Sequence, residues 1–213
     1  MRMTTTFARL KKAGACETGY RTLAKHLVSV EEYGEDKEIN LLTILESNGF
    51  YDALWCLRAT VQDCDKEKRF IACNFAESVL NIFESKRPDD DRPRKYIEDA
   101  RKFANGELSS EELNKSRDAA YAAAYAASKF AGKFSADDAA AVSDAAYAAA
   151  YAAAAVVTAA YDTAYGAAYE AAAVAVAAAT YDAADVADDA AATASLEVKK
   201  QQLTEIFRKH LQD

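Results

Sequence analysis

Proline and glycine are scarce in this sequence. The chain of 213 residues has only 2 prolines and 7 glycines. A β-sandwich, a β-barrel or a Rossmann-type α/β fold needs a glycine-rich loop or a turn about every eight to twelve residues. The sequence therefore predicts an all-α protein, a helical bundle whose mass of 23.1 kDa is enough to bury a core.

Histidine and cysteine are also few. The 2 histidines are His26 and His210, and no pair among the 4 cysteines has the close spacing of a zinc knuckle. The chain has no glycine-rich phosphate loop, no nucleophile elbow and no H-E-x-x-H motif. We therefore expect reduced thiols, no metal, no cofactor and no enzyme activity, with carboxylates brought together by folding as the catalytic alternative left open.

The sequence has no long, strongly apolar run. Its longest uncharged stretch, between Asp144 and Asp162, is mainly alanine and tyrosine, whereas a membrane helix needs about 20 strongly apolar residues. The first residues of the chain do not form the apolar segment of a secretory signal. We expect no membrane association and a cytoplasmic location.

Acidic residues outnumber basic ones, 34 to 26, which gives a net charge of -8. Residues 118–195 hold 10 acidic and 2 basic residues, so the whole net charge lies there, together with 40 of the 50 alanines. Nucleic acid and anionic lipid attract the opposite charge. We therefore expect no direct binding to nucleic acid and favour a basic protein as the partner.

Composition divides the chain into three parts that we expect to form one structural unit. Residues 1–117 are a helical globular part, residues 118–195 are an Ala/Tyr/Asp-rich helical repeat part packed on it, and residues 196–213 are a C-terminal amphipathic docking helix. In this last part Leu203, Phe207 and Leu211 follow helical spacing, and Ser195 is the predicted N-cap.

Local signals predict where the helices of the first part begin and end. Asparagine-glycine pairs favour a helix end, proline favours the first helical turn, and Ser-x-x-Glu is a capping box. The predicted boundaries are a helix end at Asn48–Gly49, a cap at Asp52, a long amphipathic helix from about Asp65 to Arg87–Pro88, a helix that opens at Pro93 and closes at Asn105–Gly106, and a capping box at Ser109–Glu112.

An alanine-tyrosine module recurs in the second part. The ten residues D-A-A-Y-A-A-A-Y-A-A at 118–127 are repeated letter for letter at 144–153, and a looser copy lies at 162–171. Tyrosine gives a large contact area at low entropic cost, so the module is a candidate recognition surface; packing of the tyrosines in the core is the alternative. The candidate partner-binding residues are Asp118, Tyr121, Tyr125, Asp144, Tyr147, Tyr151, Asp162, Tyr165 and Tyr169.

Three consecutive aspartates, Asp89, Asp90 and Asp91, form a second candidate site for a basic partner. A calcium site usually needs six or more oxygen ligands in a defined loop, and arginines at 87, 92 and 94 flank the aspartates. A turn held by local ion pairs is therefore the favoured alternative to partner or cation binding.

Part of the chain resembles a known family. The resemblance depends on Leu54–Cys56, a Phe83–Glu84 helix end, the turn Arg87–Arg94 and the glycine at 106, followed by alanine-rich helices. This pattern is similar to the Imm5-like immunity protein family, and residues 39–58 also look like phage-encoded relatives of unknown role. The resemblance implies an all-α protein that binds another macromolecule. Tyrosines stand where the relatives often have histidines, so no histidine-based role is implied.

Together these observations favour a non-enzymatic inhibitor, either a toxin immunity protein or a phage factor against a host defence. It would cover its target with an acidic, tyrosine-bearing helical surface. A DNA mimic is less favoured, because Asp182, Asp185 and Asp188 fall opposite the tyrosines on a helical wheel. The alternative class is a structural or oligomerisation scaffold, with a homodimer formed through alanine-rich faces.

Overall fold

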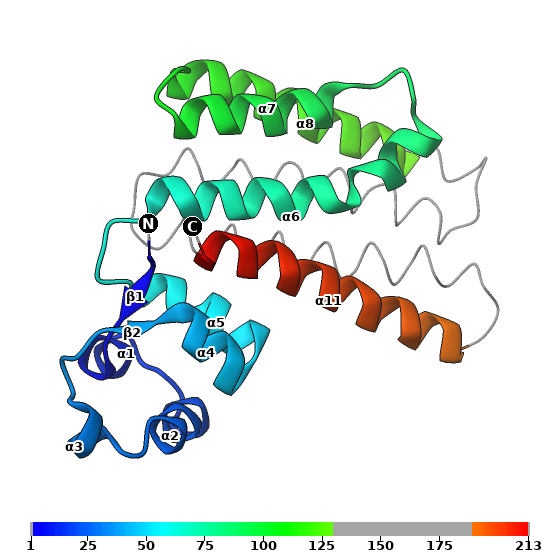
Figure 1. Ribbon diagram of the computed structural model, residues 1–213. Helices are drawn as coiled ribbons and strands as arrows, with labels where there is room; N and C mark the ends of the chain where they lie inside the picture. The colour runs from blue at the N-terminus through cyan, green and yellow to red at the C-terminus, as the bar shows by residue number, and fades with distance from the viewer. Residues whose placement is uncertain (1, 130–188, 213) are drawn as a thin grey trace. The chain divides into compact units, whose positions relative to one another are not determined.

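The computed structural model describes residues 2–129 and 189–212, with side chains at 2–126 and 196–212 (Figure 1). Their regular elements are helices, apart from one pair of two-residue strands, so the all-α prediction is confirmed. The chain divides into two compact units, residues 1–65 with 207–213, and residues 66–206. Within the described ranges, no helix has the length and apolar character needed to cross a membrane.

The N-terminal unit surrounds a short antiparallel strand pair. Thr4 pairs with Asn40 and Thr5 with Ile39. The Thr5 hydroxyl also donates to the Ala59 carbonyl at 2.6 Å. Phe7 is fully buried in this unit. Its elements are β1 (Thr4–Thr5), α1 (Phe7–Lys12), α2 (Glu17–His26), α3 (Val30–Tyr33), β2 (Ile39–Asn40), α4 (Leu41–Asn48), α5 (Phe50–Trp55) and the 3-10 helix η1 (Cys56–Ala59).

The junction of α4 and α5 confirms one predicted boundary and corrects another. α4 ends at Asn48, and Gly49 adopts a φ of 89° that glycine alone reaches without strain. The predicted cap at Asp52 is wrong, because α5 begins at Phe50 and Asp52 lies in its first turn. Gly49 serves as the boundary of both helices, so the chain re-enters a helix at once and needs no aspartate cap.

α6 (Asp65–Lys86) is the long amphipathic helix predicted from the sequence. Ile71, Phe75, Val79 and Phe83 recur at every fourth residue and are fully buried. The helix ends directly before Arg87–Pro88, as predicted, because the residue before a proline disfavours helical backbone. This helix supplies the apolar face against which its unit is built.

α7 (Arg92–Ala104) and α8 (Ser110–Lys129) form a helical hairpin (Figure 1). Proline in the first turn of α7, its end before Asn105 and the capping box of α8 are all confirmed. In the box the Ser109 hydroxyl accepts from the Glu112 amide at 3.3 Å, and Glu112 Oε2 accepts from the Ser109 amide at 3.0 Å. α8 continues through the composition change at residues 117 and 118.

α11 (Asp189–Gln212) is the last helix. The prediction that Ser195 caps it is wrong, because the chain is already helical at Asp189. The intervening residues include alanines, the strongest helix formers, which favour extension of the helix ahead of the serine. Leu203, Phe207 and Leu211, which follow the predicted helical spacing, are all buried.

Candidate partner-binding surface

The first copy of the alanine-tyrosine module lies on the described part of α8. Its inner face is made of Ala120, Ala123 and Ala124, which are fully buried, as is Leu113 two turns before Ala120. The opposite face is exposed at positions that follow helical spacing. These exposed residues are Glu111, Lys115, Asp118, Ala122 and Tyr125.

The tyrosines of this copy do not fill the core. Tyr125 is 57% exposed, and Tyr121 is half-buried. The space beside the small alanines is instead filled in part from α7, where Tyr96 is fully buried. Burial raises the pKa of Tyr96, and its hydroxyl has no hydrogen-bond partner among the described residues. Core packing, the alternative considered for the tyrosines of the module, therefore does not describe Tyr125.

Asp118 forms an ion pair with its neighbour Arg117. The Nε and Nη2 atoms of Arg117 donate to Asp118 Oδ1 at 3.1 and 3.0 Å. The aspartate side chain remains 70% exposed. Exposed ion pairs of this kind contribute about 0–1 kcal/mol, so water or a partner's basic group can replace the arginine at little cost.

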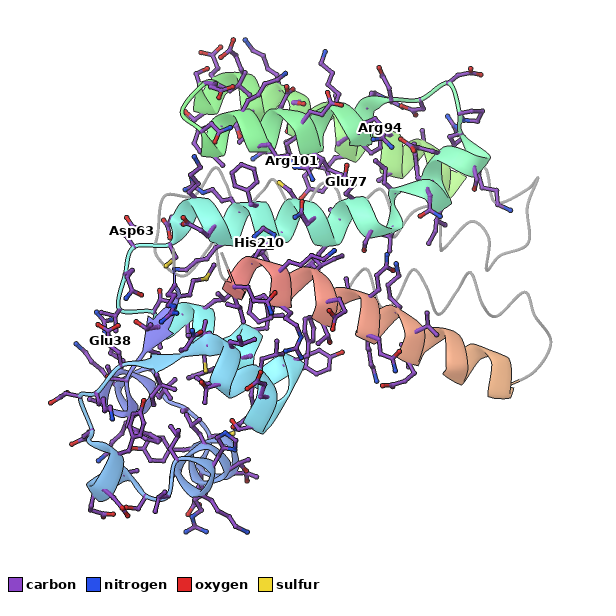
Figure 2. The ribbon with its side chains drawn as sticks, viewed as in Figure 1. Glu38, Asp63, Glu77, Arg94, Arg101 and His210 are labelled. Carbon is purple, nitrogen blue, oxygen red and sulfur yellow. The ribbon has the colours of Figure 1, made fainter. Side chains whose placement is uncertain are left out.

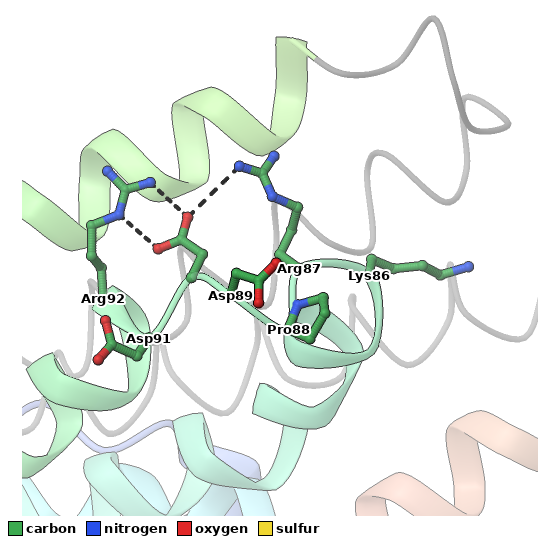
Figure 3. A pocket seen from close by; sticks show the side chains of 7 residues that line it. Lys86, Arg87, Pro88, Asp89, Asp91 and Arg92 are labelled. Atoms are coloured by element: carbon green, nitrogen blue, oxygen red, sulfur yellow. Dashed lines mark hydrogen bonds and ion pairs between the residues drawn. The ribbon is translucent and has the colours of Figure 1, made fainter.

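The turn between α6 and α7 is organised around Asp90 (Figure 3). Asp90 accepts two hydrogen bonds from Arg92, at 2.7 and 2.6 Å, and lies 3.8 Å from Arg87 Nη2. The Arg92 hydrogen bond holds the pKa of the Asp90 carboxyl below its usual value. Asp90 is therefore held in local ion pairs, the alternative favoured in the sequence analysis, and its charge is compensated by arginines of the same turn.

The other two aspartates of the turn differ from Asp90. Asp89 and Asp91 are exposed, and the Asp91 carbonyl accepts from the Lys95 amide at 2.8 Å at the start of α7. Residues 86–92 line an open concavity of about 560 Å³. Within the described ranges, no group of histidine, cysteine and carboxylate side chains is arranged to hold a metal ion.

Two ion pairs between α6 and α7 fix the turn in place, and sequence reasoning missed both (Figure 2). Arg94 donates to both oxygens of Glu84 at 2.6 and 2.7 Å. Arg101 contacts Glu77 and donates to Asn74 Oδ1 at 2.7 Å, and the Arg101 hydrogen bond lowers the pKa of Glu77. Both the acids and the arginines are spaced by seven residues, a pattern that could have revealed two antiparallel helices joined by charge.

A further acidic surface, also missed, lies on the N-terminal unit. It consists of the exposed carboxylates Glu31, Glu32, Glu35 and Asp36. Burial raises the pKa of the nearby Tyr20, and the charges of Glu35 and Glu31 raise it further. The run of acids after residue 30 was the available signal. The composition of residues 1–117, which is nearly neutral in sum, concealed it.

The remaining predicted residues lie outside the described ranges. They are Asp144, Tyr147, Tyr151, Asp162, Tyr165 and Tyr169.

The chain has no match among known protein families, curated proteins or solved structures. The likeness to the Imm5-like family therefore stays a prediction, and the arrangement of α8 carries the functional argument.

Proposed function

We propose that this protein is a non-enzymatic inhibitor that binds a basic macromolecular target and covers its working surface, as a toxin immunity protein or a phage factor against a host defence. The observation that carries the proposal is the outer face of α8. There Tyr125 is 57% exposed and follows Asp118 by two helical turns, while Ala120, Ala123 and Ala124 are buried on the inner face.

An exposed tyrosine on a well-packed helix is suited to recognition. Its ring buries a large area with few rotatable bonds, and its hydroxyl satisfies a polar neighbour. The net charge of -8 favours encounter with a basic surface. The resemblance to an immunity family supports the same proposal.

The test compares the tagged protein with a variant carrying Tyr121→Ala and Tyr125→Ala, both passed over host lysate with circular dichroism as a check on folding. Tyr51→Ala is the matched control, because Tyr51 is also an exposed tyrosine, 44% exposed, but lies in the N-terminal unit. We expect a basic protein that the parent and Tyr51→Ala retain and that the folded double variant loses. Equal retention by all three proteins would contradict the assignment of the surface to α8.

A second experiment separates the inhibitor from a scaffold. Ala122 is exposed beside Tyr125, so this shallow face could instead pair with a second copy of the chain. Sedimentation at increasing protein concentration decides between them: an inhibitor keeps one size, whereas a scaffold assembles and Tyr125→Ala weakens the assembly.

A further inference from the structure

The end of the last helix belongs to the core of the N-terminal unit. Residues 207–213 form one compact unit with residues 1–65. Phe207 is fully buried and Leu211 is 1% exposed. The ring of Phe207 meets that of Phe50 edge to face, with centroids 6.0 Å apart. Two apolar side chains from the far end of the chain therefore complete this core.

The ion pair between Arg208 and Glu46 adds little to this docking. Arg208 Nη1 lies 3.6 Å from Glu46 Oε1, and the two side chains are 31% and 54% exposed. Long, partly exposed pairs of this kind are weak beside the burial of two large apolar side chains. Docking is therefore governed by the apolar contact with α5.

We propose that Phe207–Gln212 is a conformational strap for the N-terminal unit. When docked, it covers Phe50. When it detaches, it uncovers that ring on α5 beside Tyr51, which is already 44% exposed. The strap is the end of α11, and the residues directly before it belong to the other unit. Only non-covalent contacts therefore hold the strap against the N-terminal unit. It can leave without breaking the backbone of the strand pair or of α1 to α5, as in the local openings that hydrogen exchange detects.

The test is amide hydrogen exchange on the full-length protein, with the parent beside Phe207→Ala. Removal of a buried phenylalanine side chain raises the population of the open form by about 100-fold or more. We expect exchange to accelerate by that factor at residues 207–212 and in Leu41–Trp55. Exchange in Lys66–Ala104 should stay within about threefold of the parent, because that segment belongs to the other compact unit.

Leu203→Ala is the matched control. Leu203 lies on the same helix face one turn earlier and is also fully buried, but it belongs to the other unit. It should leave Leu41–Trp55 unchanged. If Phe207→Ala does not fold, Phe207→Leu is scored by the same pattern. The strap proposal would be overturned if Phe207→Ala left exchange in Leu41–Trp55 unchanged. It would also be overturned if Phe207→Ala and Leu203→Ala both raised exchange equally throughout the chain.

Discussion

Gly19 lies where α2 approaches α5 so closely that a single methyl group should decide the sign of a stability change. A Cβ at this position would lie 2.8 Å from Asp52 Oδ2 and 3.3 Å from Cys16 Sγ. The carboxylate is not free to retreat, because Asn48 Nδ2 donates to it at 2.9 Å and to the Gly19 carbonyl at 2.8 Å. The contact is therefore tighter than normal packing.

Two effects of Gly19→Ala oppose each other. Alanine gains about 1 kcal/mol over glycine inside a helix, whereas overpacking of a fixed contact costs about 1–3 kcal/mol. We expect a net destabilisation of about 1 kcal/mol, which is a fall in Tm of about 2–4 °C for a chain of this size. Urea unfolding followed by circular dichroism measures it.

Measuring Gly19→Ala in an Asp52→Ala background tests whether the steric contact causes the destabilisation. With the carboxylate removed, the clash disappears and helix propensity alone remains. Gly19→Ala should then stabilise the protein by about 1 kcal/mol, so the two substitutions couple by about 2 kcal/mol in a double-mutant cycle. If Gly19→Ala stabilises the parent as much as it stabilises the Asp52→Ala background, the steric argument is refuted.

Three further outcomes follow from groups in or near the core. The lowered pKa of Glu77 means that its pairing with Arg101 stabilises the fold above the usual glutamate pKa of 4.5 and is lost as pH falls through the lower value; Arg101→Ala should cost about 1 kcal/mol at pH 7 and flatten unfolding curves measured between pH 5 and 2. Burial raises the pKa of Cys73 to about 12, so iodoacetamide should label the exposed Cys16 in the folded protein and the three buried cysteines only in denaturant, as mass spectrometry would show. Within the part of the chain that the structure describes, the buried Tyr96 hydroxyl has no hydrogen-bond partner, so Tyr96→Phe should raise the free energy of unfolding by about 1 kcal/mol in urea titrations. A loss of stability would contradict the absence of a hydrogen bond there.

Helix ends were predictable where the signal is local. The stop before Pro88, the end at Asn48 and the capping box at Ser109 each depend on residues within one turn, so the sequence is sufficient. The errors have the opposite origin. Asp52 and Ser195 are good caps in isolation, but neighbouring backbone had already entered a helix, at Gly49 and among the alanines before Ser195.

The candidate surface was only partly predictable for a similar reason. The repeat locates the tyrosines on one side of a helix, but alanine packs inward or outward with similar ease, so the pattern does not choose the buried face. The choice depends on Tyr96 of α7, a tertiary partner 25 residues before Tyr121. The pairing of Asp90 was predictable as an alternative, because its arginines are adjacent in sequence.

The place of Phe207 and Leu211 in the N-terminal unit also sets the order in which that unit can be completed during synthesis. Residues 66–206 are 141 residues, and at about 5–20 residues per second the ribosome needs roughly 7–28 s to make them. Throughout that interval the N-terminal unit has its strands and helices but not its last two core side chains. The N-terminal unit can therefore be completed only after residues 66–206 have been made.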